Sequence, residues 1–148
     1  MTDYEALCRE ADALFSGVPH PLANLANGAA LLGERLDDVN WAGFYLAEGE
    51  LLTLGPFWGR PACTEIPFSR GVCGAAARSG EAVLVKDVHQ FPGHIACDSR
   101  SRSEVVIPLW KNGVLYGVLD VDSPTLARFD EADLRGLSAF CRILEAAL

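Results

Sequence analysis

Three cysteines lie outside the apolar patterns of this sequence, in turn-like or loop-like segments. They are Cys63, after Pro61-Ala62; Cys73, within a Gly-Val-Cys-Gly run; and Cys97, followed by Asp98. The glycines and polar residues around them predict that these thiols are exposed. Exposed cysteines carry out redox chemistry or bind metal ions, whereas buried ones fill a core. The sequence therefore favours redox chemistry or a metal site over structural packing for this set.

The other two of the five cysteines, Cys8 and Cys141, lie on apolar helical stripes and are expected to pack as small hydrophobic residues. A zinc site of Cys63, Cys73, Cys97 and His94 is the alternative to redox chemistry. Structural zinc sites usually pair their ligands at short spacing, which this set lacks. The sequence thus favours redox use, with no metal and no cofactor.

The composition and charge of the chain indicate its cellular compartment and exclude some classes of partner. The chain has 148 residues, half of them hydrophobic, and a net charge of −8. This charge repels nucleic acid and anionic lipid surfaces, so neither is expected as a partner. No stretch approaches the roughly 20 apolar residues of a membrane helix, and the acidic N-terminus lacks a secretory pattern. We therefore expect the protein to be cytoplasmic. Stable disulfides are rare in that compartment.

The elements that must position these cysteines form one domain over residues 1–148, without repeat or linker. Apolar spacing predicts helices from Tyr4 to Phe15, from Pro21 to about Gly33, over Gly71–Arg78 and after Asp130. The expected second helix has an apolar stripe of Leu22, Leu25, Ala29 and Leu32. Strands are expected over Asn40–Leu46, Leu51–Phe57, Thr64–Phe68, Ala82–Val85, Val105–Trp110 and Val114–Val121. The first two flank a hairpin loop over Ala47–Glu50, and a long functional loop spans Asp87–Ser103. The order predicts an α+β fold with a largely antiparallel central sheet and helices packed on it.

Three acidic residues on the last two strands form a second candidate site. Asp120 and Asp122 share one strand face, where carboxylates are costly unless they bind something. A three-residue Lys111-Asn112-Gly113 loop would pair Glu104 with Asp120, whereas a two-residue turn would send Glu104 to the opposite face. We expect the three-residue loop, and at least one raised carboxyl pKa in the crowded set.

Two aromatic residues on one strand supply a possible apolar wall. Trp41 and Tyr45 lie four residues apart, so they share a face with the small Gly43 between them. This spacing predicts a hollow flanked by two rings. Packing of the same rings in the sheet core fits the pattern equally well.

Several runs together resemble the GAF-domain free methionine-(R)-sulfoxide reductases. They are N-W-A-G-F-Y-L from Asn40, L-G-P-F from Leu54, G-V-C-G from Gly71, D-V-H-Q-F-P-G-H-I-A-C-D from Asp87, S-R-S-E from Ser101 and G-V-L-D-V-D-S-P from Gly117. The resemblance implies a GAF fold, reduction of free methionine sulfoxide, frequent homodimers and recycling by thioredoxin. It also places Trp41 and Tyr45 in the substrate pocket.

The resemblance assigns roles to the cysteines. Cys97 corresponds to the catalytic nucleophile, Cys63 to the resolving residue and Cys73 to a secondary thiol. A thiolate at Cys97 attacks the sulfoxide sulfur and becomes a sulfenic acid, which a second thiol converts to a disulfide. His94, Arg100, Arg102 or backbone dipoles must favour the thiolate. On the chain-entropy estimate, a disulfide across this loop stabilises by at most about 4 kcal/mol.

The acids then receive hypothetical roles in the same reaction. Glu104 and Asp122 are candidates to donate a proton to the sulfoxide oxygen, and Asp120 to support them or to hold the substrate ammonium. Because GAF domains also bind small ligands without catalysis, a sensory module is the alternative from a different class. Such a module usually carries an output domain, for which this chain has no spare length.

Overall fold

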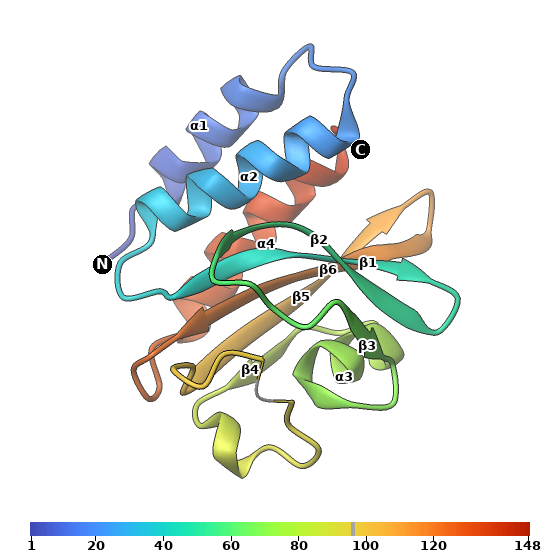
Figure 1. Cartoon of the computed structure of the whole chain (residues 1–148). Helices are drawn as coiled ribbons and strands as arrows, with labels where there is room; N and C mark the ends of the chain where they lie inside the picture. The colour runs from blue at the N-terminus through green and yellow to red at the C-terminus, as the bar shows by residue number, and fades with distance from the viewer. Residues whose placement is uncertain (96) are drawn as a thin grey trace.

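An antiparallel sheet forms the centre of the computed structural model, which describes residues 1–95 and 97–148 (Figure 1). Within this part of the chain the sheet has six strands in the order β3-β2-β1-β6-β5-β4. The strands are β1 (Trp41–Glu48), β2 (Leu51–Gly59), β3 (Glu65–Pro67), β4 (Val83–Val85), β5 (Ser103–Lys111) and β6 (Val114–Ser123). Every neighbouring pair is antiparallel, which confirms the expected α+β architecture.

Helices cover both faces of the sheet. The helices α1 (Tyr4–Phe15), α2 (Pro21–Arg35) and α4 (Glu131–Glu145) pack together on one face (Figure 1). Helix α3 (Gly71–Ser79) lies on the other face, with the short 3-10 helix η1 (Val88–Gln90) in the following segment. Pro21 begins α2 because its fixed φ suits a first helical position, and Asp130 caps α4 in a reciprocal capping box with Asp133.

Strand alternation divides the apolar side chains into two cores. On β1, Ala42 and Phe44 join the core beneath α1, α2 and α4, whereas Trp41 and Tyr45 join a smaller core beneath α3. Cys8 and Cys141 belong to the larger core, as their helical spacing predicts. The chemistry-bearing side chains therefore belong to the smaller core.

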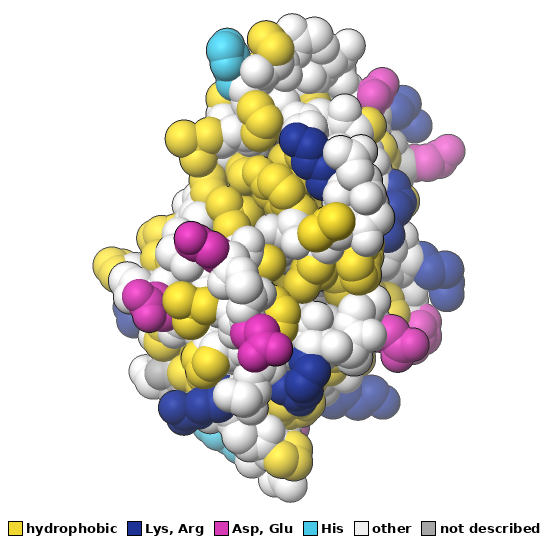
Figure 2. Space-filling model, turned by 90° about the vertical axis from the view of Figure 1, so that its right-hand side faces the viewer, with side chains coloured by type: hydrophobic (Ala, Val, Ile, Leu, Met, Phe, Trp, Pro, Cys, Tyr) yellow, Lys and Arg dark blue, Asp and Glu magenta, His cyan; other side chains and the backbone are white. Residues whose placement is uncertain are grey.

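Two local expectations were wrong. Glu48 pairs with Leu51, so the first hairpin turns through Gly49-Glu50 alone, and Gly49 has a positive φ of 62°. Leu22 is 68% exposed, because burial along α2 starts only at Asn24. Figure 2 shows apolar side chains gathered on one face of the molecule, among scattered acidic and basic side chains. In the described residues, no helix combines the length and apolar character needed to cross a membrane.

Candidate active site

A pocket opens between α3, the sheet and the segment after η1. Its wall contains the aromatic pair, all three acids and two of the three candidate cysteines, Cys73 and Cys97. The residues that line it are Trp41, Tyr45, Ala62, Ile66, Gly71, Val72, Cys73, His94, Ile95, Cys97, Asp98, Ser101, Glu104, Asp120 and Asp122. Its free volume is about 40 Å³, enough for a few water molecules. The structure thus brings Cys97, Cys73, the acids and the aromatic pair to one site.

The three acids lie on one sheet face, although the expected turn was wrong. The β5–β6 hairpin turns through Asn112-Gly113, both with positive φ, and Lys111 pairs with Val114. A β-bulge then shifts the register by one residue, because Trp110 pairs with Leu115 but Leu109 pairs with Gly117. Glu104 consequently pairs with Asp122 rather than with Asp120 or Val121. Because of the bulge, Glu104 lies on the same sheet face as Asp120 and Asp122. With the two-residue turn alone, Glu104 would lie on the opposite face.

Burial and mutual repulsion control the charge of this acidic set. Glu104, Asp120 and Asp122 are only 6%, 6% and 8% exposed. Burial raises the pKa of Asp120 well above its usual value, and the charges of Asp122 and Glu104 add to the effect. Burial and the Glu104 charge likewise raise the pKa of Asp122. The expected rise in carboxyl pKa agrees with the direction found for both aspartates.

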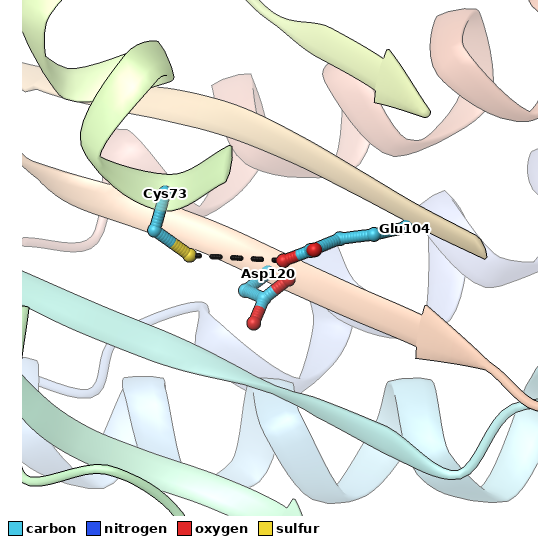
Figure 3. A group of neighbouring side chains, drawn as sticks. All are labelled: Cys73, Glu104 and Asp120. Carbon is cyan, nitrogen blue, oxygen red and sulfur yellow. Dashed lines mark hydrogen bonds between the residues drawn. The ribbon is translucent and has the colours of Figure 1, made fainter. Parts of the chain in front are cut away.

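Cys73 faces the same acids from the opposite wall of the pocket. It lies in the first turn of α3, and its Sγ is 3.9 Å from Oε2 of Glu104 (Figure 3). The side chain is 3% exposed, so the expected exposure of Cys73 was wrong. Burial, followed by the charges of Asp120 and Glu104, raises the pKa of the Cys73 thiol well above its usual value. Cys73 is therefore a protonated thiol in this environment.

Cys63 and Cys97 form a disulfide across 34 positions of sequence, with their Cα atoms 5.4 Å apart. Both residues are half-buried, and Cys97 lines the pocket. The bond occupies two of the sulfur atoms that the zinc alternative requires, so the Cys63, Cys73, Cys97 and His94 set is not available as metal ligands in this form. It leaves Cys73 as the free thiol of the three.

The aromatic pair forms one wall, but the hollow between the two rings is closed. Trp41 and Tyr45 stack with centroids 5.9 Å apart, and Phe57 also stacks on Trp41, at 5.3 Å. A Cβ atom on Gly43 would lie 2.7 Å from Cη2 of Trp41, so the indole covers the glycine. The Trp41 indole N–H donates to the Arg60 carbonyl, and the Tyr45 hydroxyl donates to the Cys63 carbonyl. The pair thus contacts the segment that carries Cys63.

Asn40 is a site residue that the sequence did not single out. Its buried side-chain amide donates to Oδ2 of Asp98 and to Oγ of Ser101, each at 3.1 Å. Arg100 pairs with Asp98 at 2.8 Å, and this contact, aided by Asn40, lowers the pKa of Asp98 to about 2. Only the three-dimensional contact reveals Asn40, because its sequence neighbourhood predicts the start of a strand. Asn40 anchors the segment that carries Cys97.

The structure places the three side chains that could favour a Cys97 thiolate in different surroundings. His94 lines the pocket together with Cys97. The Arg100 guanidinium is engaged by Asp98, and Arg102 is exposed. Ala96, which belongs to the run that carries the family resemblance, lies outside the described residues.

Comparisons with known proteins agree with this geometry. The GAF domain model matches residues 21–148. The free methionine-R-sulfoxide reductase of Escherichia coli K12 is 50% identical over 145 residues, covering 98% of this chain and 88% of that protein. A reduced-form structure of fRMsr of Staphylococcus aureus superposes with a TM-score of 0.97 at 47% identity, covering 100% of this chain and 96% of that one. The enzyme from Neisseria meningitidis, in complex with its substrate, superposes with a TM-score of 0.93 at 46% identity, covering 97% and 87%. The chain belongs to the GAF-domain family and, within it, to the free methionine-R-sulfoxide reductases.

Proposed function

We propose that this protein reduces free L-methionine-(R)-sulfoxide to L-methionine, using Cys97 as nucleophile and Cys63 as resolving thiol. The Cys63–Cys97 disulfide at the pocket is the observation that carries this assignment. The preference for the R epimer comes from the relatives that carry this name.

The reaction proceeds in two balanced steps. The Cys97 thiolate attacks the sulfoxide sulfur, the oxygen passes to Cys97, and methionine leaves while Cys97 becomes a sulfenic acid. The Cys63 thiol then attacks the Cys97 sulfur, water leaves, and the disulfide forms. His94, which lines the pocket beside Cys97, is the group that we assign to favouring the thiolate.

The acidic set divides between two tasks in this proposal. Glu104 and Asp122, directly paired across β5 and β6, supply the proton that the sulfoxide oxygen needs. Asp120, two residues before Asp122 on the same face of β6, supports them or binds the substrate ammonium. Trp41 and Tyr45 contact the methyl thioether end, because sulfur packs well against aromatic rings. An acidic and largely buried pocket favours a free amino acid, whose ammonium offsets the carboxylate charge.

The proposal includes partners that the chain itself does not contain. We assign thioredoxin in the cytoplasm as the reductant that reopens the half-buried disulfide. The apolar face in Figure 2, together with the exposed Leu22 and Val114, is consistent with a homodimer. We treat the whole chain as one GAF domain, because α1 packs into the same core as α2 and α4.

A single-turnover experiment tests the chemistry. The reduced protein is mixed with free methionine-(R)-sulfoxide in the absence of reductant, and methionine and remaining thiols are counted per chain. Wild type and the control Cys141→Ser should form about one methionine and lose two thiols. Cys97→Ser should do neither.

Other outcomes would separate the alternatives. Methionine formation that survives Cys97→Ser would remove Cys97 as the nucleophile. Methionine formed with the loss of two thiols in Cys63→Ser would assign the resolving role to Cys73. A wild-type protein that binds methionine sulfoxide without forming methionine would support the sensory module.

A further inference from the structure

An unpaired oxygen lies inside the acidic pocket. Oδ1 of Asp120 is buried and has no hydrogen-bond donor among the described residues. A buried carboxyl oxygen without a partner is costly, and such atoms commonly bind an ion, a water molecule or a ligand. Asp120 lines the pocket together with Cys73 and Glu104. The unpaired oxygen therefore indicates a position for a positively charged ligand.

Three possible ligand atoms in this pocket lie close together, on three different elements. Sγ of Cys73 on α3, a carboxyl oxygen of Glu104 on β5 and a carboxyl oxygen of Asp120 on β6 all lie within 4.8 Å of one another (Figure 3). The sulfur and Oε2 of Glu104 are 3.9 Å apart. In a tetrahedral zinc site with bond lengths near 2.0 and 2.3 Å, sulfur and oxygen ligands are roughly 3.5 Å apart. Small side-chain rotations would bring the three atoms to that spacing.

We propose that Cys73, Glu104 and Asp120 form a binding site for one zinc-class divalent cation, and that the bound ion blocks the pocket. A thiolate with two carboxylates suits zinc or cobalt(II) rather than magnesium or calcium, which prefer oxygen ligands alone. Three protein ligands leave the fourth position for water, and the free volume of the pocket accommodates it. Binding releases the thiol proton of Cys73 and any proton that the carboxyl groups hold.

This site differs from the zinc set considered from the sequence. It uses neither Cys63 nor Cys97, so it is complete while those two are joined in the disulfide. Its effect on catalysis rests on the proposed function: the ion takes the place that we assign to the substrate ammonium and removes the acidic protons. We therefore expect zinc to compete with methionine sulfoxide.

The disulfide form of the whole chain allows a direct test of metal binding. Cobalt(II) is added, and thiolate-to-cobalt charge-transfer absorption is recorded; zinc affinity is then measured by competition with a chromophoric chelator. Wild type and the control Cys141→Ser should bind one ion per chain with the thiolate absorption. Cys73→Ser should lose the absorption, and Cys73→Ser and Asp120→Asn should each weaken zinc affinity at least about tenfold.

Two results would overturn the site. One is charge-transfer absorption that persists in Cys73→Ser, and the other is the absence of stoichiometric binding by folded wild type, with folding checked by circular dichroism. Inhibition is measured separately, by single-turnover reduction with and without zinc. Binding without inhibition would overturn the blocking role alone, and a protein that lacks reductase activity can still be tested for the metal.

Discussion

Glu104 pairs with Asp122 across the two strands, and its carboxyl group lies near the Cys73 thiol. Its proposed role as proton donor can be tested by substitution. Glu104→Gln keeps the shape of the side chain but removes the transferable proton. We expect single-turnover reduction to slow by about 100-fold or more, the usual range for loss of a general acid. Rapid-quench measurement of methionine gives the rate. Glu65→Gln, at an exposed position on β3, is the matched control; a Glu104→Gln rate equal to this control would exclude the acid role.

Asp120 gives the protein an unusual dependence of stability on pH. Its pKa is raised in the folded state, so the folded protein holds a proton that the unfolded chain releases near pH 4. The stability that this proton supplies is fully present below about pH 4 and is lost as pH rises toward the folded-state pKa. Each unit of pKa difference corresponds to about 1.4 kcal/mol.

Replacing Asp120 by Asn should remove this contribution. We expect the unfolding free energy of Asp120→Asn to fall less steeply than that of wild type between pH 5 and 8, with Asp122 still supplying part of the slope. Denaturant unfolding at several pH values measures both slopes. Equal slopes would mean that the folded protein does not keep the Asp120 proton.

Residue spacing and the family resemblance together predicted most of the site, but not the burial of the Cys73 thiol. The pairing of Cys63 with Cys97 followed from the family resemblance, and the shared face of Asp120 and Asp122 followed from strand alternation. Cys73 was expected to be exposed because glycines surround it. In the structure those glycines permit close packing instead: a Cβ atom on Gly74 would lie 2.8 Å from the Phe68 carbonyl oxygen. Local composition cannot distinguish these two uses of glycine.

Gly43 controls how β1 presents its aromatic residues to the pocket. A Cβ atom at this position would lie 2.4 Å from Cβ of Phe57 and 2.7 Å from Cη2 of Trp41. Gly43→Ala should therefore displace the Trp41 ring and cost about 1–3 kcal/mol of unfolding free energy, as overpacking usually does. Thermal unfolding and near-ultraviolet circular dichroism measure the two effects. If stability falls while the KM for methionine sulfoxide stays unchanged, Trp41 does not form the substrate wall.

The pairing register of the β5–β6 hairpin could not be predicted from the sequence. The turn residues Asn112-Gly113 fit a two-residue turn, and the shared face of the acids was correctly expected. Counting residues alone made these two facts incompatible, so a three-residue loop was inferred. The bulge between Leu115 and Gly117 reconciles them. A bulge adds one residue without a distinctive pattern in one sequence, and only strand pairing reveals it.

At the scale of the whole molecule, the pocket and the larger hydrophobic core lie on opposite faces of the sheet. The larger core joins α1, α2 and α4 to one sheet face, whereas the pocket lies in the smaller core with α3 and the segment after η1. Contacts that hold this segment in the described part of the chain include the Gly71 N–H with the Gly93 carbonyl, the Asn40 amide with Asp98 and Ser101, and the disulfide. Changes in this segment can therefore occur without disturbing the larger core.

The disulfide should make the pocket less accessible once turnover is complete. With Cys97 tied to Cys63, the free volume of about 40 Å³ holds a few water molecules, whereas methionine requires more room. Reduction removes one of the contacts that hold the segment, so it should permit the pocket to widen. We expect methionine to bind the reduced protein at least about tenfold more tightly than the disulfide form, a difference of about 1.4 kcal/mol. Calorimetric titration of both forms measures it, with Cys63→Ser expected to match reduced wild type and Cys141→Ser expected to respond to oxidation as wild type does. Equal affinities in the two forms would mean that the disulfide does not restrict the pocket, and that methionine release is independent of disulfide formation.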